Sequence, residues 1–307
     1  MQRRVVGWMA LALTWAVSAA AQTLLGPPVL VSPEPFCNPV GADVAPLPGG
    51  GAVVAWREDD PAGSFIQARL LDPEGQPTGE ALAVAAGLGL GEPQVAATGE
   101  HLAVAFFSAV SNQTQVQVYE RPGLAFVDGF PLGAAATRPR SLDAAPDGSF
   151  LLVNAADTAI DLARFEPDGT ILGQESLFQI GGARRFSDVT GVVAGSGAYL
   201  AFREVPAGGA PSGLPVVLTR LRLDGGVDPS APPTREIPGA RDVQLATLPD
   251  GRLVAVWEDA EGVVFDLMDE NLVTATRLRL AVFPGGGSSP RLAVSPAREI
   301  AMRSARD

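Results

Sequence analysis

The sequence predicts an all-β fold built from a repeated unit of short strands, and three observations support this. The 307 residues include 35 glycines and 27 prolines, which supply many turns. No long stretch has the 3.6-residue hydrophobic spacing of an amphipathic helix, so we expect almost no helix. An apolar run ending in a large or polar residue recurs along the chain, with last residues at Trp56, Phe106, Asn154, Phe202, Trp257 and Arg303.

The first 21 residues are typical of a secretory signal. Arg3 and Arg4 precede an apolar run over residues 5–17, and small residues follow it. We expect cleavage before Gln22 and an exported protein, secreted or periplasmic. The apolar run is short for a bilayer span, and nothing later approaches about 20 uninterrupted apolar residues, so we expect no membrane insertion after cleavage.

The charge of the mature chain limits its partners. Cleavage would remove two arginines and leave 20 basic against 34 acidic residues, a formal charge of −14. Such a surface repels phosphate backbones, so we do not expect a nucleic-acid partner. All basic residues other than the single histidine are arginines, which favours a GC-rich bacterial genome as the source.

Each copy of the repeat has the same internal order. A short strand such as "DVAPL" (43–47) leads through a glycine turn to the apolar run, for example "AVVAW" (52–56). A polar loop and a third strand follow, as in "FIQARLLD" (65–72). Two copies continue into a weaker fourth segment, over residues 72–84 and 166–178. Four short strands per repeat are typical of a propeller blade.

The apolar runs indicate how the repeats pack. In "LVAVW" neighbouring side chains point to opposite faces of a sheet and all are apolar, so both faces must be covered. Blades packed around an axis cover both faces. The rival fold, tandem β-sandwiches, would repeat near 100 residues, about twice the spacing of the apolar runs in this sequence. We therefore predict one domain over 22–307, a six-bladed β-propeller with blades at 38–87, 90–135, 136–182, 183–239, 240–286 and 287–307 plus 26–33.

The last blade is the exception. It stops after two strands, and the segment 26–33 would join it as an N-terminal strand that closes the circle. Its third strand is missing from the sequence, so this blade is either three-stranded or the chain is a truncated gene product.

The repeats "PDGRLVAVWED" (249–259) and "PGGGAVVAWRED" (48–59) resemble those of secreted bacterial β-propeller-repeat proteins. The resemblance covers residues 26–307 and implies an architecture and no activity. Copies three and six depart from the pattern, because Asn154 and Arg303 replace the aromatic residue.

Few residues suit catalysis. His101 and Cys37 are the only histidine and cysteine and lie far apart in sequence, so we expect no His–Cys metal site and no cofactor. Asp43, Asp188 and Asp242 each precede a strand expected to line the channel, where carboxyl groups could serve as acid and base in glycoside hydrolysis. Alternatively, these aspartates accept hydrogen bonds from loop amides, a structural use that we favour.

Loops on the same face carry five arginines, which either form ion pairs on the rim or bind carboxylate or sulfate groups: Arg138, Arg140, Arg184, Arg185 and Arg241. We therefore predict a monomeric, non-catalytic binding module for a protein or an anionic glycan. The alternative is a carboxylate-dependent glycoside hydrolase or lyase that uses the three aspartates. A purely structural envelope protein is a third possible class. The long loop at 203–215 argues against it, because it makes the fourth copy differ from the others.

Overall fold

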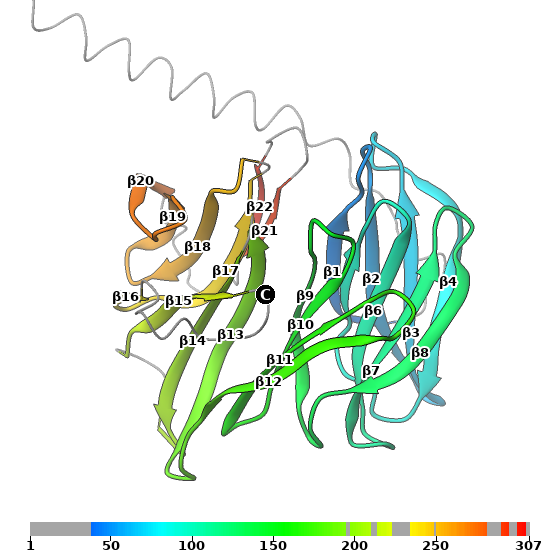
Figure 1. The fold of residues 1–307 in the computed structure, drawn as a ribbon, viewed down its shortest axis with the longest axis horizontal. Coiled ribbons are helices and arrows are strands. Elements are labelled where there is room, and N and C mark those ends of the chain that lie inside the picture. The colour runs from blue at the N-terminus through cyan, green and yellow to red at the C-terminus, as the bar shows by residue number, and fades with distance from the viewer. Residues whose placement is uncertain are drawn as a thin grey trace, which may run out of the picture. The chain divides into compact units, whose positions relative to one another are not determined.

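Five four-stranded antiparallel sheets and one two-stranded sheet make up the described part of the chain (Figure 1). The computed structural model describes residues 38–194, 197–209, 214–222, 234–248, 250–280, 290–294 and 300–304, and all regular elements among them are strands. The predicted signal (1–21) and N-terminal strand (26–33) lie outside the described residues. Among the described residues, no helix is long and apolar enough to cross a membrane.

The first three sheets follow the chain order. The first contains β1 (Asn38–Pro46), β2 (Ala52–Asp60), β3 (Gly63–Leu71) and β4 (Pro77–Gly87). The second contains β5 (Gln94–Ala97), β6 (His101–Ser108), β7 (Gln113–Glu120) and β8 (Ala125–Leu132). The third contains β9 (Arg138–Ala144), β10 (Phe150–Ala155), β11 (Ala159–Phe165) and β12 (Ile171–Gln179).

The remaining sheets continue the same order. The fourth contains β13 (Arg184–Ala194), β14 (Gly197–Pro206), β15 (Val216–Arg222) and β16 (Thr234–Ile237). The fifth contains β17 (Arg241–Thr247), β18 (Leu253–Asp259), β19 (Gly262–Met268) and β20 (Thr274–Leu280). The two-stranded sheet consists of β21 (Pro290–Val294) and β22 (Ile300–Ser304). A fourth strand is thus present in five sheets, whereas the sequence indicated it clearly in two copies.

Glycine turns join the first and second strands as the sequence predicts. In the turn between β9 and β10, Gly148 has a φ of 89° and its N–H donates to the Ala145 carbonyl at 3.0 Å. The Asp147 carboxylate accepts the Ser149 N–H at 3.1 Å. Gly251 repeats the geometry between β17 and β18 with a φ of 84°. Glycine is required because the left-handed region is costly for residues with a side chain.

The second strands of the second to fifth sheets, β6, β10, β14 and β18, are buried on both of their faces. In β10 every residue is buried, and successive side chains enter different apolar clusters. Leu151 and Val153 pack with residues of the fourth sheet, while Phe150 and Leu152 pack with residues of the second. β6 divides in the same way between the first and third sheets. This confirms that the apolar run is sheltered by the neighbouring repeats on either side.

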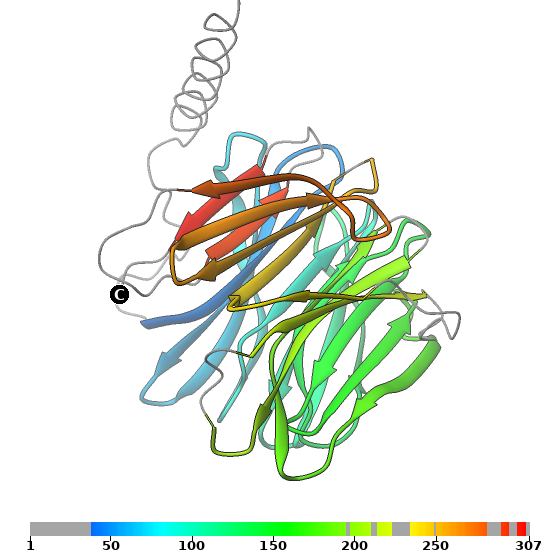
Figure 2. The ribbon, with the colours of Figure 1, turned by 90° about the vertical axis from the view of Figure 1, so that its left-hand side faces the viewer.

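The first strands of the sheets contact one another in series. Contacts join β1 to β5, β5 to β9, β9 to β13, and β13 to β17. β21 contacts both β17 and β1, and Figure 2 shows the two-stranded sheet in red beside the orange strands of the fifth sheet. The first strands therefore form the inner layer. In each four-stranded sheet the fourth strand lies furthest from this layer.

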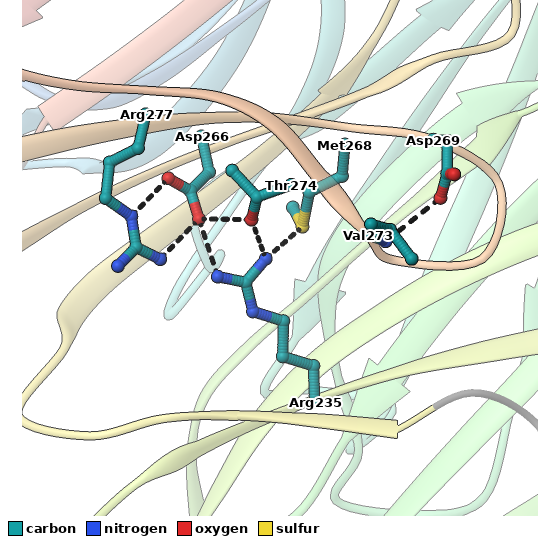
Figure 3. A network of polar contacts seen from close by, with 7 residues as sticks. All are labelled: Arg235, Asp266, Met268, Asp269, Val273, Thr274 and Arg277. Carbon is teal, nitrogen blue, oxygen red and sulfur yellow. Dashed lines mark hydrogen bonds and ion pairs between the residues drawn. The ribbon is translucent and has the colours of Figure 1, made fainter.

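A buried ion cluster joins the fourth and fifth sheets further out (Figure 3). Asp266 of β19 is fully buried. Its carboxylate accepts from Arg277 Nε and Nη2, both at 2.6 Å, and from Arg235 Nη2 of β16 at 2.8 Å. Arg235 also donates to Thr274 Oγ1 and lies 3.1 Å from Met268 Sδ through Nη1. One carboxylate thus holds arginines from two sheets.

Candidate functional site

The first strands enclose a cavity of about 530 Å³, which we call the channel cavity. Its wall comes from β1, β5, β9, β13 and β17 and from the residues next to them. The volume lies within the range of about 300–1,000 Å³ that is usual for small-molecule sites. The residues that line it are therefore the first place to look for function.

Five polar side chains line the channel cavity at one level of the strand register. Each is paired, across the sheet, with the last but one residue of the apolar run in the second strand. Asp43 is paired with Ala55, and Thr190 with Ala201. Since the sheets repeat, equivalent register positions lie at equivalent heights. We call this set the polar ring, and its members are Asp43, Gln94, Ser141, Thr190 and Gln244.

Part of the polar ring braces adjacent sheets. The Asp43 carboxylate accepts the N–H of Val95 in the next first strand at 2.9 Å, and Ser141 Oγ accepts the N–H of Gly191 at 2.9 Å. The inner edge of a sheet leaves backbone N–H groups without a strand partner, and a neighbouring side chain can satisfy them. The bracing is close to the structural use that we favoured for the aspartates, although the amide belongs to the next sheet rather than to a loop.

Asp143 and Glu92 add two further carboxyl groups to the cavity wall, and Asp143 is the one placed on a first strand. It lies opposite Leu151, at a level where the first, fourth and fifth sheets have Ala45, Val192 and Ala246. Its carboxylate accepts the N–H of Val193 at 2.7 Å and the N–H of Ala144 at 2.8 Å. Burial raises the pKa of Asp143 to about 6, the negative charge of Asp43 adds to the rise, and the two backbone hydrogen bonds oppose it.

Two arginines lie side by side on the same wall. The Arg138 guanidinium stacks over the Phe107 ring, 5.0 Å from its centroid. Burial lowers the pKa of Arg140 and the positive charge of Arg138 lowers it further, while Glu92 and Asp157 act in the opposite direction. A guanidinium group carries a positive charge at neutral pH. We call Arg138 and Arg140 the arginine pair.

The other predicted site residues lie elsewhere. Asp188 and Asp242 have φ values of 52° and 49° in irregular parts of β13 and β17, and neither is among the described residues that line the cavity. Asp188 forms an ion pair with the buried Arg203, whose Nε lies 3.4 Å from Oδ2. The structure therefore brings Asp43 to the cavity and not the other two aspartates.

The five predicted arginines divide in the same way. Arg138 and Arg140 line the cavity. Arg184 instead forms an ion pair with Glu204, Arg185 lies opposite Val205 in the sheet, and Arg241 lies opposite Glu258. All three are exposed. The cavity thus combines Asp43, two of the expected arginines and Asp143, which the sequence reasoning missed.

No protein-family model matches the chain, and no curated protein sequence matches it. Solved structures do. The α-L-arabinanase of Penicillium chrysogenum, solved with arabinobiose, has a TM-score of 0.57 at 11% identity, over 83% of this chain and 84% of that one. The subtype N10 neuraminidase-like protein of A/little yellow-shouldered bat/Guatemala has a TM-score of 0.54 at 10% identity, over 88% and 95%.

The Dos1 propeller has a TM-score of 0.50 at 9% identity, over 84% of this chain. This chain spans 64% of the Dos1 propeller and 62% of an ACO/RPE65 chimera of similar score. At such low identity the likeness shows the fold alone, which is that of a β-propeller. An enzyme, the arabinanase, and a protein described only as a propeller both occur among these structures, so the fold does not select a function.

The raised pKa of Asp143 predicts a pH-dependent stability. The folded protein holds this proton up to a pH of about 6, whereas an unfolded aspartate releases it near 3.8, so ionisation of Asp143 lowers the free energy of unfolding as the pH rises between these values. In Asp143→Asn this loss should disappear. Urea denaturation of both proteins from pH 4 to 7 measures it, and a wild-type minus variant difference that does not change with pH would contradict the prediction.

Proposed function

We propose that the protein is an exported, non-catalytic binding module with a six-bladed propeller fold, whose channel cavity binds an anionic group of its ligand. Five four-stranded sheets and the two-stranded β21–β22 sheet support six blades. In this proposal residues 26–33, which lie outside the described residues, supply a further strand of the sixth blade. The contacts of β21 with both β17 and β1 support a ring closed by this sheet. The order of residues 1–21 supports export, and cleavage before Gln22 can be checked by N-terminal sequencing of the mature protein.

The arginine pair carries the proposal. Two like charges side by side repel, and among the described residues neither guanidinium donates a hydrogen bond. The opposite charges that act on Arg140 belong to Glu92 and Asp157. A guanidinium presents two parallel N–H groups that match a carboxylate or a sulfate, and a bound anion would relieve the repulsion. The ligand is then an anionic glycan or an acidic segment of a protein.

Substitution of the arginine pair tests this proposal. The double variant Arg138→Gln, Arg140→Gln should bind anionic oligosaccharides about 100- to 10,000-fold more weakly, because each of the two lost charge-assisted hydrogen bonds contributes about 1.5–3 kcal/mol. Calorimetric titration with oligogalacturonate and with heparin oligosaccharides measures it. Arg184→Gln is the matched control, since Arg184 already pairs with Glu204. Equal binding by the double variant, or no binding of any anion by the wild type, would refute the proposal.

A carboxylate-dependent glycoside hydrolase or lyase is a second candidate, favoured by the two carboxyl groups of Asp43 and Asp143 in one cavity. Asp143 has a pKa of about 6, as a general acid requires, and Asp43 can act as base or nucleophile. Release of reducing ends from an acidic polysaccharide by the wild type, and its loss in Asp143→Asn, would establish this candidate. We favour binding because both carboxylates already accept backbone N–H groups of the next sheet.

A further inference from the structure

The polar ring contains side chains whose hydrogen-bonding groups are not used within the protein. Thr190 is 8% exposed and lines the channel cavity, yet its hydroxyl makes no hydrogen bond to another described residue. Gln244 is half-buried and also lines the cavity, and its amide likewise makes no hydrogen bond to another described residue. Polar groups on a cavity wall that are not used within the protein can hydrogen-bond a ligand or water in the cavity.

The other ring members keep part of their capacity. Ser141 Oγ accepts from Gly191, which leaves its O–H to donate. Gln94 Nε2 donates to the Pro93 carbonyl at 3.0 Å, which leaves its amide oxygen to accept. The ring therefore offers donors and acceptors together. An ammonium group would need acceptors alone, whereas a hydroxyl group both donates and accepts and can use this mixture.

The polar ring also adjoins the arginine pair. Arg140 and Ser141 are consecutive in β9 at the bulge in its pairing with β10, and both line the cavity. A ligand that fills both places must carry an anion and hydroxyl groups within a few ångströms. In a uronic acid the carboxylate stands on a ring carbon beside one that bears an oxygen substituent, so a single sugar unit can reach both.

We propose that the polar ring binds the hydroxyl groups of a saccharide whose carboxylate lies on Arg138 and Arg140, so that the ligand is a short uronic-acid oligosaccharide. This inference rests on the anion binding proposed above and names its substrate class. Among the described residues that line the cavity, Phe107 is the single aromatic, and Arg138 covers its ring. Recognition therefore depends on hydrogen bonds and ion pairs rather than on stacking of sugar rings.

The test compares saccharides with hydroxyl-free anions. Disaccharides of galacturonate, glucuronate and mannuronate are titrated in parallel with adipate, a dicarboxylate without hydroxyl groups, against wild type, Gln244→Ala and Thr190→Val. We expect at least one uronate disaccharide to bind, and each ring variant to bind it about 5- to 50-fold more weakly with adipate binding unchanged. Gln115→Ala is the matched control, because Gln115 lies in β7 and hydrogen-bonds Ser111. Thermal melting of every variant checks folding.

The outcomes separate the two proposals. Ring variants that bind the disaccharide as the wild type does, while the double arginine variant does not, would overturn the hydroxyl ring and leave anion binding standing. A wild type that binds heparin oligosaccharides and no uronate disaccharide would also overturn the hydroxyl binding by the polar ring and leave anion binding standing. A wild type that binds none of these anions would overturn both. If Thr190→Val fails to fold, Gln244→Ala and Gln94→Ala carry the comparison.

Discussion

Replacing Asp266 by alanine should lower the free energy of unfolding by about 3–5 kcal/mol, the range found when one partner of a buried ion pair is removed. The carboxylate is fully buried and holds Arg235 and Arg277. Without it, Arg235, whose side chain is 22% exposed, keeps its charge in the protein with no carboxylate beside it. Arg277 is 52% exposed and can turn to water, so most of the loss comes from Arg235.

Chemical denaturation and thermal melting measure this loss. Arg184→Ala is the control, since the Arg184–Glu204 pair is 65% and 36% exposed and should contribute less than about 1 kcal/mol. Asp266→Asn keeps the shape and removes the charge, and should lose nearly as much as the alanine variant. A change in Asp266→Ala as small as that of the Arg184 variant would show that the cluster is of no net value to stability.

Replacing Arg203 by methionine should cost about 3 kcal/mol or more. Arg203 is 1% exposed, donates to the Ala240 carbonyl ahead of β17, and forms the ion pair with Asp188. Methionine fills much of the same volume but leaves the Asp188 carboxylate, 19% exposed, with its charge poorly compensated. Denaturant midpoints of wild type and variant measure the effect, and Arg203→Lys should recover part of it.

The same residues decide the role of Asp188. If it only balances Arg203, Asp188→Asn will lower the stability and leave binding of anionic oligosaccharides at the channel cavity unchanged. Reduced saccharide binding with unchanged stability would instead place Asp188 in the functional site. This comparison tests the catalytic role predicted for Asp188 without any assumption about the cavity.

The repeat could be predicted because its signal is redundant. The apolar run is buried on both faces in the second to fifth copies, and glycine turns precede it, so period and strand order follow directly from the sequence. The fourth strands were harder to predict. β8 and β12 are mostly exposed, and bulges interrupt the pairing of both. An exposed edge strand has no hydrophobic period to detect.

The candidate site was predicted in part, for a physical reason. Asp43, Asp188 and Asp242 share a short motif, but bulges in the first strands change which residues lie opposite one another. Asp43 therefore lies at the level of Thr190 and Gln244 rather than of Asp188 and Asp242. Asp143 did leave a signal, because in "SLDAA" an aspartate stands where the other complete copies have alanine or valine. That signal is visible only once the register is known.

The hydrogen bonds from one first strand to the next make the order of the repeats matter. Consider a chimera in which a second copy of residues 90–135 replaces residues 136–182. Gln94 and Ala96 would then stand where Ser141 and Asp143 now accept the amides of Gly191 and Val193. An alanine side chain offers no acceptor, so the Val193 amide would lose its partner and the contact between these two sheets would weaken, even with each sheet still folded. The repeats share one strand order, but the third repeat carries at Asp143 an acceptor for the fourth that the second repeat lacks.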